Sequence, residues 1–123
     1  MSVLVVDDQA VVRDCILMLL EHDGHEVVTA GSGPVALGLF APGKYDLVFT
    51  DYLMPLMKGD ELAAAVKALA PKQPVVMVTA EADELRASGR LPAGVDFLVN
   101  KPFTLDGLRE AICAVTPEKS LVE

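Results

Sequence analysis

The stretch that decides the fold is residues 3–9, VLVVDDQ, in which four apolar residues run directly into Asp7 and Asp8. A continuous apolar run without polar alternation is typical of a strand buried on both faces, as in a parallel sheet. Two neighbouring carboxylates at the end of such a strand repel each other, and a nearby cation relieves this repulsion. The stretch therefore predicts both a buried first strand and a cation site at its end.

The rest of the chain repeats this strand pattern, with helix-like segments between the strands. We expect strands at Val3–Val6, Glu26–Thr29, Leu47–Thr50, Val75–Thr79 and Phe97–Val99. Apolar residues spaced i, i+3, i+4 and i+7 predict helices over Gln9–Glu21, Asp60–Ala70 and Thr104–Thr116. Five strand–helix units predict a single α/β domain with right-handed crossovers.

Two of the helices are predicted from their ends rather than from periodicity. The residues Gly31-Ser32-Gly33-Pro34 begin the second helix, with Ser32 or Gly33 as its N-cap and Pro34 near its first turn. The segment Glu81–Asp96 contains two glycines and a proline. We therefore expect only a short fourth helix near Ala82–Ser88, followed by an irregular loop.

The composition limits the possible functions. With 123 residues, of which 52% are hydrophobic, the chain can bury one substantial core. The net charge of −8 argues against non-specific binding to nucleic acid or to an anionic membrane surface. The sequence has neither an apolar run of membrane-spanning length nor a signal-peptide pattern, so we expect a cytoplasmic protein.

The cysteines, the histidines and the last residues are not expected to carry chemistry. Cys15 and Cys113 lie in helix-like patterns and form no metal motif, so we expect two buried core thiols and no disulfide. His22 and His25 flank a glycine in a turn and are expected on the surface. The polar residues 117–123 are expected to fray.

Polar side chains gather where the predicted strands end. The strand ends carry Asp7-Asp8, Thr50-Asp51, Thr79-Ala80 and Asn100-Lys101-Pro102. Ligands of parallel sheets bind beyond the carboxyl ends of the strands, so these groups meet at one edge. An all-oxygen set of carboxylates suits Mg²⁺, which is commonly bound together with phosphate oxygens. The set therefore predicts phosphoryl chemistry, in which an aspartate can itself accept the group.

These motifs resemble the response-regulator receiver domains of two-component signalling, such as the chemotaxis response regulator. The resemblance covers nearly the whole chain and rests on Asp7-Asp8, on residues 51–59 (DYLMPLMKG), on residues 78–81 (VTAE) and on residues 101–103 (KPF). It implies a flavodoxin-like (βα)5 fold, a doubly wound three-layer α/β sandwich with a five-stranded parallel sheet in the order 2-1-3-4-5. The receiver domain would span residues 1–117, with residues 118–123 as a C-terminal tail.

The resemblance also implies a Mg²⁺ site. Asp8 matches the acid that binds the metal directly, and Asp7 matches the acid that often acts through water. Asp51 and the backbone carbonyl of Leu53 would complete the metal ligands.

The phosphoryl group is assigned in the same way. Asp51 matches the phosphoacceptor, and the donor would be a phosphohistidine on a histidine kinase or a histidine phosphotransfer domain. Thr79 matches the hydroxyl that turns toward the phosphoryl group. Lys101 matches the lysine that pairs with a phosphoryl oxygen, and the bond between Lys101 and Pro102 is expected to be cis.

Simpler structural roles are possible for three of these residues. Asp8 could be the N-cap of the following helix, Thr79 could be an ordinary β-branched strand residue, and Lys101 could be a solvated loop lysine.

The sequence departs from the family pattern in the last strand. Counting back from Lys101, Leu98 occupies the position where receivers often carry a switching aromatic residue, and Phe97 lies one residue earlier. Successive strand side chains face opposite ways, so Phe97 would point away from the switch position unless a one-residue bulge restores it.

The leading hypothesis is a phosphoacceptor switch that signals to an unknown partner and catalyses only its own phosphorylation and dephosphorylation. It could be stand-alone or excised from a larger protein such as a hybrid histidine kinase, and it is not expected to contact nucleic acid or membrane.

One alternative is a Mg²⁺-dependent phosphohydrolase resembling the haloacid-dehalogenase class, which needs a second aspartate two residues after the nucleophilic aspartate. Leu53 stands two residues after Asp51, and Gln9 stands two residues after Asp7. The other alternative is an interaction-only receiver. A flavin-binding protein of the same fold is disfavoured because the turn after the first strand lacks a phosphate loop.

Leu53 gives the first testable prediction. Receivers often carry a polar residue there, and an apolar side chain cannot orient an attacking water molecule. We therefore expect the acyl phosphate of the unsubstituted chain to have a lifetime different from that of the Leu53→Asn variant. Dephosphorylation rates of the two proteins would be compared, and equal rates would contradict the idea.

Overall fold

A computed structural model describes residues 1–89 and 91–116 of the chain. Its strands are β1 (Ser2–Val6), β2 (Glu26–Ala30), β3 (Leu47–Thr50), β4 (Val75–Thr79) and β5 (Phe97–Asn100). Its helices are α1 (Ala10–His22), α2 (Gly33–Leu39), α3 (Gly59–Leu69), α4 (Ala82–Ala87) and α5 (Leu105–Val115). The expected strands and helices are all confirmed, with boundaries shifted by one residue at several ends.

The five strands form one parallel sheet in the order β2-β1-β3-β4-β5. This order confirms the flavodoxin-like fold expected from the resemblance. It places β1 and β3 side by side in the middle of the sheet, so the residues that follow these two strands lie next to each other.

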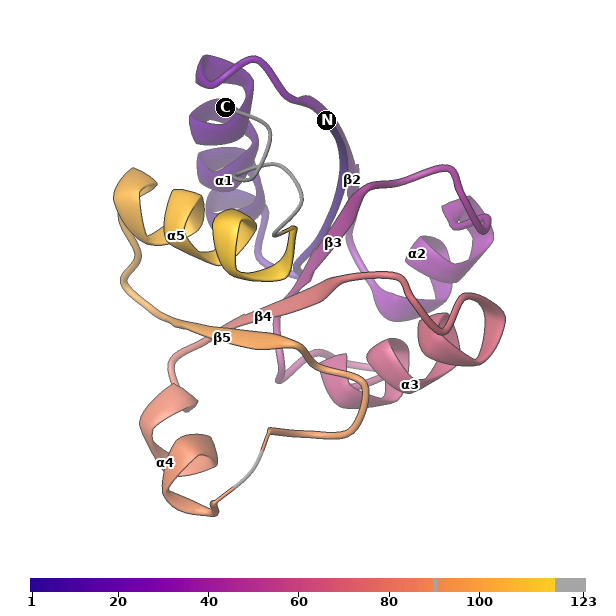
Figure 1. Cartoon of the computed structure of the whole chain (residues 1–123), viewed down its shortest axis with the longest axis vertical. Helices are drawn as coiled ribbons and strands as arrows, with labels where there is room; N and C mark the ends of the chain where they lie inside the picture. Colours follow the sequence, from indigo (N-terminus) through magenta and orange to yellow (C-terminus); the bar gives the residue numbers. More distant parts are fainter. Residues whose placement is uncertain (90, 117–123) are drawn as a thin grey trace.

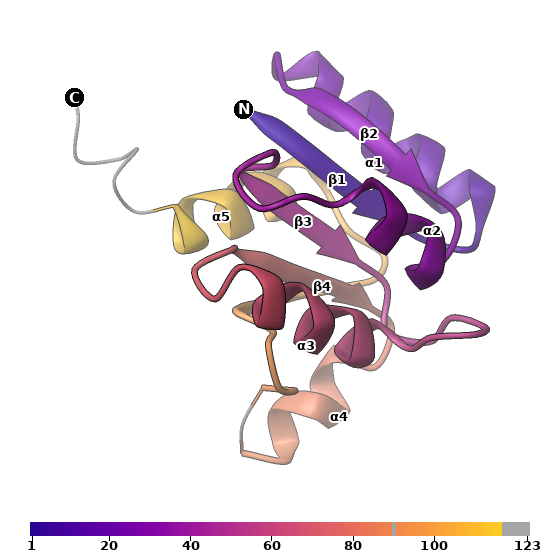
Figure 2. The same cartoon turned by 90° about the vertical axis from the view of Figure 1, so that its right-hand side faces the viewer.

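Helices cover both faces of the sheet. Figures 1 and 2 show α1 and α5 on one face and α2 and α3 on the other, with α4 near the β5 edge. Arg109 on α5 joins the first pair of helices through two 2.7 Å hydrogen bonds to Asp23, just after α1. Because this Arg109–Asp23 ion pair is at the surface, it contributes little to folding stability and mainly positions the two helices.

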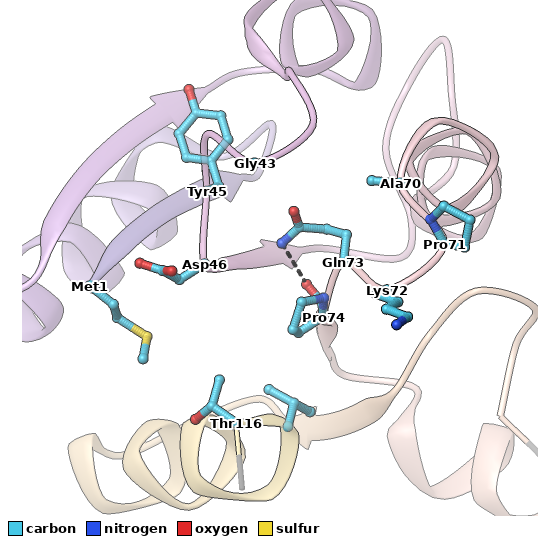
Figure 3. A pocket seen from close by; sticks show the side chains of 11 residues that line it. Met1, Gly43, Tyr45, Asp46, Ala70, Pro71, Lys72, Gln73, Pro74 and Thr116 are labelled. Carbon is cyan, nitrogen blue, oxygen red and sulfur yellow. Dashed lines mark hydrogen bonds between the residues drawn. The ribbon is translucent and has the colours of Figure 1, made fainter. Parts of the chain in front are cut away.

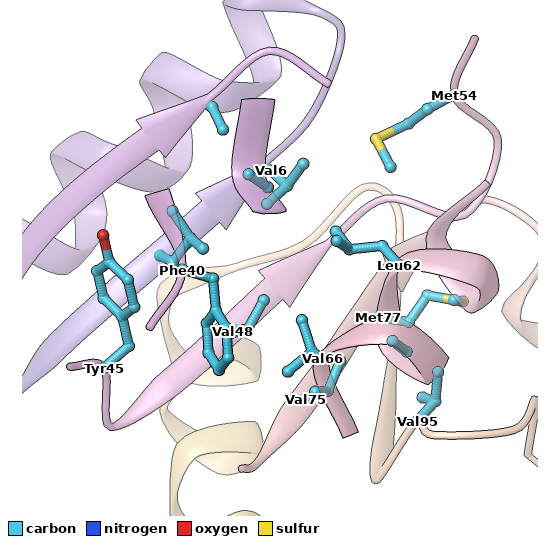
Figure 4. Packing of buried hydrophobic residues seen from close by; sticks show 14 of the residues in the cluster. Val6, Phe40, Tyr45, Val48, Met54, Leu62, Val66, Val75, Met77 and Val95 are labelled. Atoms are coloured by element: carbon cyan, nitrogen blue, oxygen red, sulfur yellow. The ribbon is translucent and has the colours of Figure 1, made fainter. Parts of the chain in front are cut away.

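Alternate residues of each strand supply two separate hydrophobic cores. In β1, Val3 and Val5 pack under α1 and α5, whereas Leu4 and Val6 pack under α2 and α3. Figure 4 shows the second core, in which Val6 and neighbouring strand residues meet side chains from α2 and α3. A strand that is buried on both faces needs apolar residues at every position, which explains the unbroken apolar runs.

Both cysteines are exposed and free, so the expectation that they are core thiols is wrong. Cys15 precedes Ile16, and Cys113 follows Ile112. The isoleucines occupy the buried faces of α1 and α5, and neighbouring helical residues point about 100° apart. Each cysteine is therefore turned outward.

The helix ends follow their local sequence. The Ser32 side chain accepts a hydrogen bond from the Val35 N–H at 3.3 Å, and Thr104 accepts one from the Gly107 N–H at 3.0 Å. These contacts identify Ser32 as the N-cap of α2 and Thr104 as the N-cap of α5. The fourth helix, α4, is confirmed as a short element of six residues.

None of the helices in the described part of the chain has the length and apolar character needed to cross a bilayer. The tail expected to fray, residues 117–123, lies outside the described residues.

Two glycines with the same backbone angle give a stability prediction. Gly43 and Gly94 both have φ of +81°, but a Cβ on Gly94 would lie 2.9 Å from the carbonyl carbon of Ala63, whereas one on Gly43 meets nothing within 4 Å. We expect Gly43→Ala to cost about 1–2 kcal/mol from the left-handed backbone alone. Gly94→Ala should cost clearly more because it also displaces α3. Urea unfolding measures both variants, and equal losses would contradict this packing role.

Candidate functional site

The carboxyl edge of the sheet brings three carboxylates together. Asp7 and Asp8 follow β1, and Asp51 follows β3. One carboxylate oxygen from each lies within 4.8 Å of the others. The register of β1 against β3 causes this convergence, because Val6 pairs with Thr50 and the two strands end level with each other. The set contains only oxygen ligands, the chemistry that hard divalent cations prefer.

Lys101 reaches this cluster from the end of β5. Its Nζ lies 3.2 Å from an oxygen of Asp7 and 3.4 Å from an oxygen of Asp51. The lysine side chain is mostly buried, so it is not the solvated loop lysine that was one alternative. The bond between Lys101 and Pro102 is cis, as expected.

Asp51 is a buried carboxylate with few compensating contacts. Burial raises its pKa most, Lys101 opposes this rise, and the negative charge of Asp7 adds to it. The backbone N–H of Tyr52 donates to Asp51 at 2.8 Å and also lowers the pKa. The net effect is a pKa above the ordinary value, which means that the ionised group is costly until a cation arrives.

The turn after Asp51 packs tightly against its backbone. The Gly59 N–H donates to the Tyr52 carbonyl at 2.8 Å. A Cβ at position 59 would lie 1.9 Å from the Asp51 carbonyl oxygen, so only glycine fits there. This contact gives the glycine that ends the DYLMPLMKG segment a structural reason: it closes the loop onto the Asp51 backbone.

The two adjacent aspartates have different environments. Asp7 is buried at 1% exposure, and its carboxylate pairs with Lys101 and accepts from the Gln9 N–H at 2.9 Å. Asp8 is exposed. The N-cap of α1 is Gln9, so the alternative in which Asp8 caps this helix is wrong. Asp8 is therefore left facing solvent at the edge of the cluster.

Thr79 and Leu53 complete the expected set. Thr79 ends β4 and is fully buried, and its hydroxyl is hydrogen-bonded to Glu81. Leu53 lies two residues after Asp51 with its side chain half exposed.

Three residues that hydrogen-bond to the site residues had no predicted role. Arg13 donates to the Asp7 carbonyl oxygen at 2.8 Å, Tyr52 donates to Asp51, and Glu81 holds Thr79. Tyr52 and Glu81 stood inside the motifs of residues 51–59 and 78–81, but nothing marked either residue individually. Arg13 donates from its side chain to a main-chain oxygen and Tyr52 donates its main-chain N–H, and main-chain partners leave no mark in a residue pattern.

The last strand has no bulge. Phe97 pairs with Val76, and Leu98 pairs with Met77, in a regular register. Leu98 therefore occupies the position three residues before Lys101, packed in the core beneath α2 and α3. Phe97 faces the other core, beneath α1 and α5.

A hollow lies at the other end of the sheet, where the strands begin. It has a volume of about 650 Å³ and is lined by residues that include Met1, Tyr45, Gln73 and Thr116 (Figure 3). These residues stand before the strands begin or after α5 ends. The hollow is thus remote from the carboxylates.

Comparison with known proteins decides the family. The family model described as "Response regulator receiver domain" matches residues 3–113. The chain belongs to the response regulator receiver domain family. Receiver domains are the signalling domains of two-component systems, found in response regulators and in sensor kinases, and they are not conventional enzymes.

Relatives of this receiver domain differ in length. Chemotaxis protein CheY of Pseudomonas aeruginosa is 39% identical over 91% of this chain and 93% of its own length. Sensory transduction protein RegX3 of Mycolicibacterium smegmatis is 35% identical, but the chain spans only 50% of RegX3. Sensor histidine kinase RcsC of Salmonella typhi is 35% identical, and the chain spans 12% of it. The chain thus spans about half the length of two of these relatives, 50% of RegX3 and 45% of the regulator TcrX of Mycobacterium tuberculosis.

Solved structures agree with the fold. A receiver domain protein from Clostridium thermocellum superposes with a TM-score of 0.85 at 30% identity, covering 99% of this chain and 98% of its own. The response regulator TrrA from Thermotoga maritima, crystallised in complex with Mg(2+)-BeF, has a TM-score of 0.79 at 31% identity, covering 93% and 97%.

The raised pKa of Asp51 makes the stability of this receiver domain depend on pH. A carboxyl group with a raised folded-state pKa contributes stability below its unfolded pKa, about 3.9, and loses that contribution as pH rises through the folded value. We therefore expect Asp51→Asn to raise the melting temperature at pH 7 and to raise it less near pH 4. Thermal unfolding by circular dichroism, with Asp14→Asn on the exposed face of α1 as control, measures this difference. An Asp51→Asn variant that is less stable than the unsubstituted chain at pH 7 would contradict it.

Proposed function

We propose that this receiver domain is a phosphoacceptor switch in which Asp51 takes a phosphoryl group from a phosphohistidine. A carboxylate oxygen of Asp51 attacks the phosphorus, and the bond between phosphorus and the imidazole nitrogen breaks. The electron pair of that bond returns to the imidazole, which then takes a proton. The observation that carries the proposal is the convergence of three carboxylates and one ammonium at the exposed end of a parallel sheet.

The carboxylates fit Mg²⁺ by their donor chemistry. Asp8, Asp7 and Asp51 would hold the ion together with the Leu53 carbonyl, and the ion would supply positive charge to the transferring phosphoryl oxygens. Asp8 is the exposed member and is assigned as the direct ligand. Asp7 already pairs with Lys101 and is assigned as the outer ligand. The raised pKa of Asp51 supports the proposal, because an incoming cation relieves the cost of its charge.

Lys101 and Thr79 are proposed to recognise the new phosphoryl group. Lys101 lies 3.4 Å from Asp51, within reach of an oxygen attached there. Thr79 ends the neighbouring strand β4, where its hydroxyl can turn to donate a hydrogen bond. A local change of charge read by two side chains in this way shifts an equilibrium between two conformations.

The phosphodonor, the output partner, the location and the domain bounds are proposed as the sequence predicts them. The phosphodonor is a histidine kinase or a histidine phosphotransfer domain, the output partner is a protein, and the location is the cytoplasm. The receiver domain is assigned to residues 1–117 and the tail to residues 118–123. Relatives that include regulators and sensor kinases support both a stand-alone form and a place in a larger protein.

Treatment with acetyl phosphate and Mg²⁺ tests the proposal. We expect the intact mass to increase by one phosphoryl group, because the small donor needs only the acceptor and the cation site. The adduct should be absent in Asp51→Asn and when EDTA removes the metal, whereas the control Asp14→Asn, an exposed aspartate of α1, should still form it. Failure of the unsubstituted chain to form an adduct would favour the interaction-only alternative, and continuous turnover of a phosphate ester would favour the phosphohydrolase.

A further inference from the structure

Two hydrogen bonds join Thr79 to Glu81 at the connection between β4 and α4. The Thr79 hydroxyl donates to Glu81 Oε1 at 2.9 Å, and it accepts from the Glu81 backbone N–H at 3.1 Å. Glu81 occupies the N-cap position of α4. The hydroxyl therefore ties the last residue of β4 to the beginning of the next helix.

The hydroxyl in these contacts is the same hydroxyl that is proposed to hydrogen-bond the phosphoryl group on Asp51. A threonine hydroxyl has one proton to donate. That proton points to the Glu81 carboxylate, and a hydrogen bond to an ionised acceptor is stronger than one between neutral groups. A phosphoryl group on Asp51 can receive the proton only if Glu81 gives it up. Glu81 and the phosphoryl group thus compete for one hydroxyl.

Resting on the function proposed above, we propose that Glu81 is a positioning residue that regulates the same site. In the unphosphorylated chain its carboxylate holds the Thr79 hydroxyl. When a phosphoryl group draws the hydroxyl away, both hydrogen bonds to Glu81 are lost and the N-terminus of α4 is released.

The stability of α4 depends on these two hydrogen bonds because the helix is short. The helix has only six residues, too few to be stable by itself. It is held by Ala82, which is buried in the core beneath α2 and α3, by Leu85, which packs against that core, and by Arg86, which donates to the Leu98 carbonyl at 2.7 Å. Loss of the hydrogen bonds at its N-cap, Glu81, therefore removes part of a small set of contacts that hold α4.

The last strand, β5, offers no second way to transmit a change at the Thr79 hydroxyl. Leu98, at the position where receivers often carry an aromatic switch residue, has an apolar side chain that is 2% exposed and packed in the core. It has no side-chain group that could follow the Thr79 hydroxyl by hydrogen bonding. The change at Thr79 is consequently read through Glu81 and α4.

Binding of beryllofluoride with Mg²⁺, a stand-in for the phosphoryl group on Asp51, tests the competition by isothermal titration calorimetry. Glu81→Ala removes the competing acceptor, so beryllofluoride should bind about two- to tenfold more tightly, the range expected for one hydrogen bond. Glu81→Gln keeps an acceptor oxygen but makes it neutral and therefore weaker, so its affinity should lie between those of the unsubstituted chain and Glu81→Ala. Glu84→Ala removes an equal charge from an exposed position in α4 and should leave the affinity unchanged.

Amide hydrogen exchange tests the release of α4. Beryllofluoride should speed exchange of the amides of residues 82–87 in the unsubstituted chain. In Glu81→Ala these amides should already exchange faster without beryllofluoride, while Glu84→Ala should behave like the unsubstituted chain.

The outcomes separate the two proposals. No beryllofluoride binding by the unsubstituted chain would overturn the proposed function. Binding with equal affinity for Glu81→Ala and the unsubstituted chain would overturn the role of Glu81 alone. Equal tightening in Glu81→Ala and Glu81→Gln would show an effect of charge rather than of the hydrogen bond, and it too would overturn that role.

Discussion

The ion pairing of the Lys101 ammonium group with both Asp7 and Asp51 is the interaction on which the carboxyl edge of the sheet depends. Two buried carboxylates follow neighbouring strands, and the lysine supplies a positive charge 3.2 Å from Asp7 and 3.4 Å from Asp51. The three residues are far apart in sequence, so they meet only when the sheet is complete from β1 to β5. The strand order is therefore also a condition for the charge balance. A chain that placed another strand between β1 and β3 would separate Asp7 from Asp51.

Close packing holds the loop after β3 around this charge cluster. Gly59 approaches the Asp51 carbonyl so closely that no Cβ fits, and a Cβ on Gly33 would lie 2.7 Å from the sulfur of Met57. Between these contacts Leu56 has φ of +73° and is 86% exposed. A leucine adopts this left-handed backbone at a cost of about 1–2 kcal/mol. The surrounding contacts thus impose the loop conformation, and the carboxylate of Asp51 is presented by a fixed backbone rather than by a mobile one.

Most of the fold and the members of the site could be predicted because each has a signature in residue type and spacing. Unbroken apolar runs gave the strands, and polar residues at their ends gave Asp7, Asp8, Asp51 and Lys101. What the pattern could not supply is orientation. The faces of Cys15 and Cys113 depend on how each helix is rotated against the sheet, a tertiary property that the count of apolar residues leaves open. The Arg13 side chain donates to a main-chain carbonyl and Tyr52 donates its main-chain N–H, and main-chain partners have no signature in residue type.

The difference between Asp7 and Asp8 shows why orientation matters for chemistry. Adjacent residues at a strand end point in opposite directions, so a pair of identical side chains acquires one buried and one exposed member. Asp7 is then committed to Lys101, while Asp8 keeps its oxygens accessible. Asp51 lies beside both and has a pKa above the ordinary value, since burial outweighs the attraction of Lys101. One lysine therefore balances the edge only in part, and the charge that is left uncompensated is the feature that favours a divalent cation there. The same imbalance that lowers the stability of the folded chain at neutral pH is what prepares the site for an ion and a phosphoryl group.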